Sequence, residues 1–160
     1  MNEAKPWYEE IVLPALLRHA RAVYGIAMRA ALAEAGFDDI PKNGLYVIGG
    51  LALGAGDVPL GQLVEELAVS KQAAGQLVDT LVLRGYLERA VDTEDRRKLT
   101  VTLTERGKAA AATQTVAREK IDAELLARMG GEAIHLTRQT LAVLINLGQE
   151  QRKNQPPHSH

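Results

Sequence analysis

The sequence predicts a mainly α-helical fold that carries one small β-hairpin. Apolar residues recur at helical spacing over most of the chain, whereas the stretch 98–103 alternates strictly between polar and apolar residues. At 160 residues the chain is long enough for one domain with a substantial core and too short for two comfortable ones. The rest of the chain is organised around residues 60–107, where two helical patterns run directly into the alternating stretch.

Residues 60–84 predict two short helices with a tight turn between them. Each carries an apolar stripe: Leu60, Leu63 and Leu67 on the first, and Leu77, Val78 and Leu81 on the second. Residues 68–70 break this period, and Ser70 is well placed to cap the second helix. Two helices joined by so short a turn must cross steeply, which is a helix-turn-helix arrangement.

The second helix, about 70–84, leaves four polar side chains off its apolar stripe: Lys71, Gln72, Gln76 and Asp79. Lysine can reach the acceptors of guanine, and glutamine can pair both edges of adenine. Gly75 costs roughly 1 kcal/mol of helix stability against alanine, but it keeps this face slim enough to enter a major groove. We therefore expect a DNA-recognition helix here, and the competing interpretation is an ordinary helical hairpin in a core.

A two-stranded hairpin is expected to follow, with Tyr86–Arg89 as one strand and Lys98–Leu103 as the other. The second strand would bury three residues on one face, Leu99, Val101 and Leu103. The loop between the strands carries the adjacent Arg96 and Arg97. A tip of this kind can lie along phosphates or reach into the minor groove as a wing, although most charged runs are solvated turns.

Two acidic residues of the same loop, Asp92 and Asp95, would repel phosphate. Their expected role is to hold an arginine in position through a bidentate ion pair.

Residues 68–89 and 92–107 together follow a recognisable pattern. A DxxDRR-type wing leads into an LTxxG helix start, in this chain through Asp92, Asp95, Arg96, Arg97, Leu103, Thr104 and Gly107. The order of elements and both segments resemble the winged helix-turn-helix regulators of the MarR family. One departure is Ala68, because the turn often has a glycine at this position.

The resemblance implies a homodimer in which each subunit puts a recognition helix into the major groove and a wing alongside. By this analogy the DNA contacts fall on Ser70, Lys71, Gln72, Gln76, Arg96 and Arg97, with Arg84 and Arg89 as weaker candidates for backbone contacts. Many relatives release DNA when a small aromatic or phenolic effector binds between the dimer helices and the winged domain. The resemblance assigns no pocket residues here.

Helices are also expected on both sides of the winged region. The first runs from Trp7 to about Ala35, with Gly36 as its stop, and Pro14 either kinks it or marks its true first turn. A second, opened by Pro41, covers 42–53, and Val58-Pro59 forms a short strand.

Beyond the wing, Thr104 is expected to cap a helix that runs to Met129 and ends at two glycines. A last helix covers about Glu132–Gln151. The flanking helices have more apolar surface than one winged domain can cover, and an isologous dimer would bury it. We therefore expect a single domain over 1–152, in which 1–35 and 108–152 form a helical dimerisation region and 41–107 the winged helix-turn-helix, with a flexible tail at 153–160.

Composition restricts the remaining alternatives. The formal net charge of −1 does not favour nucleic acid, so the expectation of DNA binding rests on the motifs. There is no cysteine, hence no disulfide and no thiolate zinc site. No signal peptide or membrane span is visible, which predicts a cytoplasmic protein. No nucleophile, carboxylate pair, phosphate-binding loop, metal cluster or cofactor motif stands out, so we expect neither an enzyme nor a cofactor.

The function predicted from these observations is a homodimeric, sequence-specific DNA-binding transcriptional regulator. We expect a repressor that binds a pseudo-palindromic operator and responds to a small molecule. The alternative is a winged-helix module that binds a protein partner and no DNA, for which the near-neutral charge is the best support.

Overall fold

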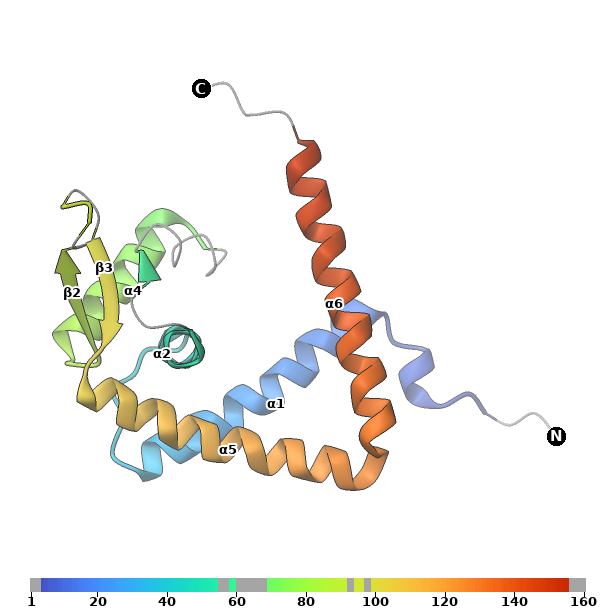
Figure 1. Ribbon diagram of the computed structural model, residues 1–160. Coiled ribbons are helices and arrows are strands. Elements are labelled where there is room, and N and C mark those ends of the chain that lie inside the picture. The colour runs from blue at the N-terminus through green and yellow to red at the C-terminus, as the bar shows by residue number, and fades with distance from the viewer. Residues whose placement is uncertain (1–3, 55–57, 60–68, 92–93, 97–98, 156–160) are drawn as a thin grey trace. The chain divides into compact units, whose positions relative to one another are not determined.

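The computed structural model describes residues 4–54, 58–59, 69–91, 94–96 and 99–155 (Figure 1). After a 3₁₀ turn at Trp7–Glu9, the elements are α1 (Leu13–Glu34), α2 (Gly44–Leu53), β1 (Val58–Pro59), α4 (Lys71–Leu83), β2 (Leu87–Val91), β3 (Leu99–Leu103), α5 (Glu105–Met129) and α6 (Gly131–Asn154). The predicted mainly helical fold with a small hairpin is confirmed. The first helix expected for the helix-turn-helix, at 60–68, lies outside the described residues.

The chain divides into two compact units, Met1–Glu119 and Lys120–His160. The first holds a small antiparallel sheet in which β3 lies between β1 and β2 (Figure 1). Leu87 pairs with Leu103 at one end of the hairpin and Val91 with Leu99 at the other. The short strand expected at Val58-Pro59 is confirmed as β1. The strand expected at Tyr86–Arg89 begins one residue later and extends to Val91.

The core of the first unit packs α2, α4, the sheet and the first turns of α5 against one another, and α1 contributes Leu32. Its buried apolar residues are Leu32, Leu45, Val47, Ile48, Leu51, Ala74, Val78, Leu81, Tyr86, Leu87, Val101, Leu103, Ala110 and Ala111. The period-two prediction is confirmed for Val101 and Leu103, whereas the side chain of Leu99 lies outside the described part of the molecule. Helix α4 and the hairpin therefore share one core, which fixes the position of each relative to the other.

Proline and glycine set the limits of α1 and α2. Helix α1 begins at Leu13 and not at Trp7, because Pro14 occupies its first turn, where the missing N–H is no loss. Of the two roles considered for Pro14, the kink is wrong. Gly36 adopts a φ of +87° just after the helix, as a stop residue does. Helix α2 begins at Gly44 and not at Lys42, since a turn from Pro41 to Gly44 precedes it.

The two expected helix caps are confirmed. The Oγ atom of Ser70 accepts a hydrogen bond from the amide of Ala73 at 3.1 Å, at the start of α4. The Oγ1 atom of Thr104 accepts one from the amide of Gly107 at 3.1 Å, at the start of α5. Thr104 also donates to the carbonyl oxygen of Gly85 at 2.5 Å, so its hydroxyl ties the end of the hairpin to the turn that follows α4.

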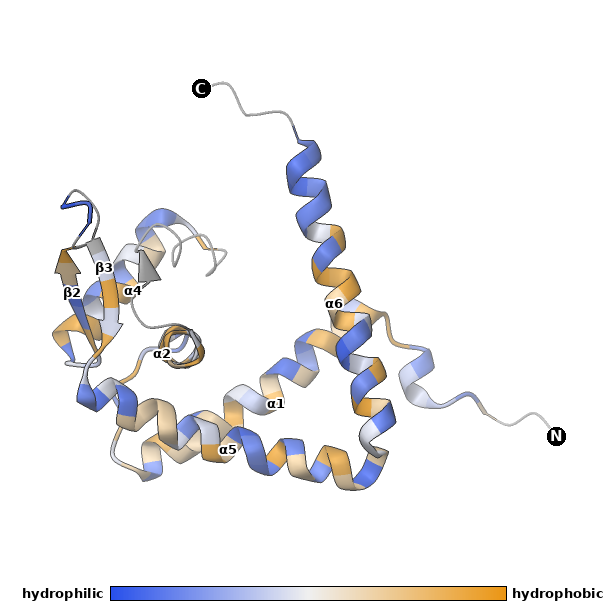
Figure 2. Cartoon of the chain, in the orientation of Figure 1, coloured by the Kyte–Doolittle hydropathy of each residue, from blue (hydrophilic) through white to orange (hydrophobic). Residues whose placement is uncertain are grey.

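The second unit consists of the end of α5 and helix α6. Gly130, with a φ of +82°, separates the two helices, as the sequence predicts. Helix α6 ends at Asn154, three residues later than expected, and none of its side chains is buried. Its apolar residues alternate with polar ones along the helix (Figure 2), and Leu136, Val143, Leu144, Ile145 and Leu147 are all exposed. The described residues of this unit, 120–155, have apolar surface but form no core of their own to cover it.

Candidate DNA-binding interface

Helix α4 presents a polar face on the side away from the core. Its buried residues are Ala74, Val78 and Leu81, whereas Lys71, Gln72 and Gln76 are exposed. Ser70, just before them, is exposed as well. Its cap uses a lone pair of Oγ and not the hydroxyl proton, which the side chain keeps as a donor. These predicted contact residues therefore stand together on one side of the helix and its first turn.

Gly75 lies between the polar residues of this face. A Cβ atom added there would meet no heavy atom of the described residues within 4 Å. The glycine is therefore not required by any contact among them, although it lowers the stability of the helix. Its effect is to leave the exposed side of α4 without a side chain at that point.

An ion pair joins α4 to the hairpin. The guanidinium Nη2 of Arg89, on β2, donates to Oδ1 of Asp79, on the exposed side of α4. Both side chains are open to solvent, so the pair contributes little to stability. It links α4 to the neighbouring strand, and the sequence did not predict it.

The wing loop is described in part. Glu94, Asp95 and Arg96 are exposed at its tip, while Asp92 and Arg97 lie outside the described residues. The strands β2 and β3 carry this tip away from the core that they share with α4 (Figure 1). The expected role of the aspartates in holding an arginine stays a prediction.

Arg84 follows the last turn of α4 and is exposed. Its Nη1 donates to the backbone carbonyl oxygen of Asp39, in the connection between α1 and α2. Part of its hydrogen-bonding capacity is therefore used within the protein, and the sequence did not predict this. A backbone contact to DNA by Arg84 stays a prediction.

A cluster of three polar side chains lies at the base of the hairpin. The hydroxyl of Tyr86, just before β2, donates to Oδ1 of Asp39. Arg106, in the first turn of α5, donates through Nη2 to the same oxygen at 3.1 Å and to the Tyr86 hydroxyl at 3.0 Å. The Arg106 guanidinium also lies 4.6 Å from the centre of the Tyr86 ring. Three segments far apart in the sequence thus meet at one point.

The cluster shifts the pKa values of its members, and that of Arg106 is raised, chiefly by its hydrogen bond with Tyr86. The hydrogen bond from Tyr86 is the main cause that lowers the pKa of Asp39, and the charge of Arg106 acts in the same direction against some desolvation. Burial is the main cause that raises the pKa of Tyr86, with the carboxylate of Asp39 adding to it. At neutral pH the cluster therefore consists of a carboxylate, a neutral phenol and a guanidinium.

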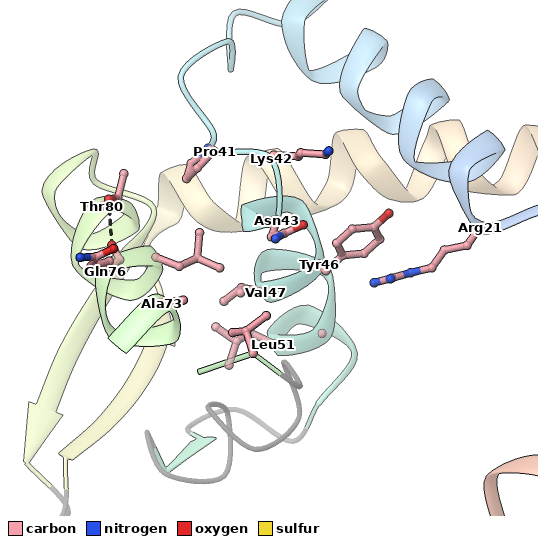
Figure 3. A pocket seen from close by; sticks show the side chains of 13 residues that line it. Arg21, Pro41, Lys42, Asn43, Tyr46, Val47, Leu51, Ala73, Gln76 and Thr80 are labelled. Carbon is pink, nitrogen blue, oxygen red and sulfur yellow. Dashed lines mark hydrogen bonds between the residues drawn. The ribbon is translucent and has the colours of Figure 1, made fainter. Parts of the chain in front are cut away.

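A cavity of about 670 Å³ lies between α2 and α4 in the first unit (Figure 3). Val47 of α2 faces Ala73 and Gln76 of α4 across it, whereas Tyr46 points away from α4 and toward Arg21 (Figure 3). Arg21 reaches it from α1, with its guanidinium 4.0 Å from the centre of the Tyr46 ring. Gln76 therefore borders a cavity as well as the exposed side of α4.

A smaller cavity, of about 190 Å³, is lined by Met28 of α1 and by residues of α2 and α5. One of its lining residues is Gln114, which is only 3% exposed. The Nε2 of Gln114 donates to the carbonyl oxygen of Leu45 at 2.9 Å, whereas its Oε1 is buried and has no hydrogen-bond partner among the described residues. An unpaired buried acceptor is costly, so this oxygen is suited to receive a donor from outside.

Residues 40–98 match the MarR family. Over these residues the chain is similar to that family. The matched span runs from just before α2 through α4 into the wing. It includes the DxxDRR pattern on which the resemblance was based, whereas the LTxxG pattern at 103–107 lies beyond its end. No curated protein matches the chain as a relative.

Solved structures with the MarR-family fold are similar over most of the chain. FabT of Streptococcus pneumoniae, solved in complex with DNA, has a TM-score of 0.72 at 21% identity and covers 90% of this chain and 99% of its own. MepR of S. aureus, in its DNA-binding conformation, has a TM-score of 0.71 at 16% identity, with 85% and 98% covered. Apo MarR of E. coli has a TM-score of 0.61 at 20% identity, with 84% and 97% covered. At these identities the likeness shows the fold.

The match over residues 40–98 is to a family of transcriptional regulators, in agreement with the function predicted from the sequence. Among the described residues, no helix is both long and apolar enough to span a membrane. Nor do they bring together three or more metal-ligating side chains.

Sequence reasoning missed Asp39, Arg106 and Gln114. Nothing in their local pattern distinguishes the first two from solvated charges. Gln114 could have been noticed, because it follows Ala110 and Ala111 on the buried side of an alanine-rich helix. The paired glycines of α2, Gly49 and Gly50, were a second sequence feature, because small residues allow another helix to approach closely. A Cβ atom on Gly49 would lie 3.6 Å from Oε1 of Gln114, so α5 does approach α2 here.

Proposed function

We propose that this MarR-family protein is a homodimeric repressor that binds a pseudo-palindromic DNA operator in the cytoplasm. The observation that carries the proposal is the exposed polar face of α4, which stands opposite a fully buried apolar face and beside a wing with Arg96 at its tip. A helix built in this way can enter a major groove without disturbing its own core. The structure of FabT in complex with DNA is consistent with such a role for this fold.

The proposed contacts are of two kinds. Base edges would be met by Lys71, Gln72 and Gln76, and phosphates by Ser70, Arg84, Arg96 and Arg97. Asp92 and Asp95 would support the wing arginines. Phosphate contacts set affinity and register, whereas base contacts set sequence preference, so the two groups should differ when they are substituted.

Dimerisation is proposed through residues 1–35 and 108–152, with 41–107 as the DNA-binding part of a single domain. The single chain leaves large apolar side chains exposed in both flanking segments, among them Trp7, Val23, Ile26, Leu126, Met129 and Ile145. Trp7, which is 70% exposed, contacts Tyr8 edge to face with the ring centres 5.9 Å apart. A second copy would cover surface of this kind, and a two-fold dimer is the commonest arrangement.

We further propose that the cavity at Gln114 receives the effector. Its volume of about 190 Å³ suits a molecule with a single aromatic ring, below the usual size of a drug-like ligand pocket. A phenolic hydroxyl could donate to the buried Oε1 of Gln114 and relieve its unpaired state. Binding would weaken DNA affinity if the effector prefers the conformation that does not fit the operator.

Selection from a pool of random duplexes tests the DNA-binding proposal. An enriched inverted repeat, with half-sites separated by roughly one helical turn of about 10 base pairs, is the expected result. If no sequence is enriched at low salt, the proposal is wrong. For the effector, single-ring phenols are titrated against the operator complex of the wild-type protein and of Gln114→Met, which should lose the response.

The second candidate function is a winged-helix module that binds a protein partner without DNA. The formal net charge of −1 favours it. A salt titration separates the two functions, because DNA affinity must fall steeply with salt as counterions are released. A slope near zero would support the protein-partner module.

A further inference from the structure

Hydrogen bonds connect the base of the wing to the α1–α2 connection. Three features of the structure indicate the role of these bonds. Tyr86 directly precedes β2, and Arg106 follows β3 by three residues. The pair Leu87 and Leu103 closes the hairpin at this end. Any movement at the cluster is therefore passed to both strands of the wing at their root.

A small rotation of the hairpin at this root produces a larger displacement of its tip. Each strand is five residues long, which places the tip about 17 Å from the base at about 3.4 Å per residue. A rotation of about 10° at the base would then move the tip by about 3 Å, enough to break a hydrogen bond to a phosphate. A rigid root is thus required if a wing arginine is to meet DNA in a defined place.

The root of the wing has more polar contacts than the stability of the fold requires. The Tyr86 ring is fully buried in the core. A phenylalanine at this position would be held in place by the same packing. The tyrosine hydroxyl nevertheless joins Asp39 and Arg106, and Arg84 adds a further hydrogen bond to the backbone of Asp39. These bonds connect the end of α4, the wing and α5 to one loop.

We propose that Asp39, Tyr86 and Arg106 are positioning residues that set the angle of the wing relative to α4, and that they act on DNA affinity through Arg96. The inference rests on the proposed DNA-binding function. Asp39 is the anchor because it accepts from both partners. Arg106 donates to both Asp39 and Tyr86, and its guanidinium also lies against the Tyr86 ring.

Tyr86→Phe is the decisive variant, since it removes the hydroxyl and leaves the buried ring. Operator affinity should fall by about fivefold, the size expected for loss of a single interaction. In a chain that already carries both Arg96→Ala and Arg97→Ala, the same substitution should have almost no effect, because the wing no longer has an arginine to position.

A loss of equal size in both backgrounds would show that Tyr86 only stabilises the fold, and would overturn the proposal. So would unchanged affinity of Tyr86→Phe in a wild type that binds its operator. If the wild type binds no DNA, the proposed function itself fails.

Hydrogen exchange supplies a readout without DNA. In Tyr86→Phe the amides of β2 and β3 should exchange faster, while those of α6 keep their rates. Uniform acceleration, or none, would count against a local role at the wing root.

Arg106→Gln provides an independent check against Lys108→Gln. Lys108 lies in the same turn of α5 but pairs with Glu105 at the surface. Each variant removes one cation, so a purely electrostatic effect on DNA would be equal in the two. The proposal requires Arg106→Gln to weaken operator binding at least several-fold more than Lys108→Gln, and equal effects would contradict it.

Discussion

The carbonyl oxygen of Tyr86 lies so close to Gly107 that a Cβ atom added to the glycine would stand 2.1 Å from it. The same carbonyl accepts the amide of Thr104 at 3.1 Å, so the start of α5 is pressed against the turn that leads into β2. The glycine of the LTxxG pattern is thus required by a backbone approach. Its own φ is not in the left-handed region.

Gly107→Ala should therefore destabilise the protein, although alanine is the better helix former. Backbone must move to admit the methyl group, and overpacking of this kind costs about 1–3 kcal/mol. Urea unfolding of the variant and the wild type measures the difference. A variant as stable as the wild type would show that the contact relaxes without cost.

Gly75→Ala is the matched substitution in open space, and the opposite sign is expected. Nothing among the described residues obstructs the added methyl group, so the free protein should gain up to about 1 kcal/mol in the same unfolding experiment. Operator affinity should fall at the same time, because the methyl group would stand between α4 and the groove. A stabilised variant with full affinity would place Gly75 away from the DNA.

Arg96→Ala should weaken binding to all DNA sequences alike. Loss of one phosphate contact lowers the slope of log K against log salt by about one unit. Fluorescence anisotropy at several salt concentrations measures that slope. Lys42→Ala removes a cation from the α1–α2 connection and serves as control. A similar change of slope in both variants would contradict a specific phosphate contact by Arg96 at the wing tip.

Gln72→Ala should act on sequence preference more than on overall affinity. A bidentate contact to adenine discriminates by about 1–3 kcal/mol at one position. The duplex selection, repeated with the variant, should show relaxed preference at that base pair and little change elsewhere. Gln76→Ala, at the border of the larger cavity, should show a weaker effect of the same kind. Unaltered preference in both would mean that neither glutamine reads a base.

The lowered pKa of Asp39 makes part of the stability depend on pH. A carboxyl group with a depressed folded-state pKa stabilises the native state above its ordinary value of 3.8 and loses this contribution as pH falls through the lower value. The wild type should therefore be more stable than Asp39→Asn at neutral pH, and the difference should shrink below about pH 4. Urea unfolding across this range checks it, and a constant difference would mean that the ionised form is not favoured.

Much of the local structure followed from the sequence because it depends on neighbours along the chain. The caps at Ser70 and Thr104, the stop at Gly36 and the alternation of β3 each involve residues within a few positions of one another. The DxxDRR and LTxxG patterns led to the family for the same reason. Periodicity also indicated which side of α4 would be buried, so the candidate polar face was predicted before the fold was known.

Only the tertiary structure brought together residues whose local patterns carry no signal. Asp39 and Arg106 resemble solvated charges in the sequence, yet they meet at Tyr86 across 67 positions of chain. Asp79 and Arg89 join α4 to β2, and Gln114 turns a polar group into the core. Such contacts depend on how helices and strands pack. The sequence thus determined most of the described elements and the polar face of α4, while packing decided what holds them at a fixed angle.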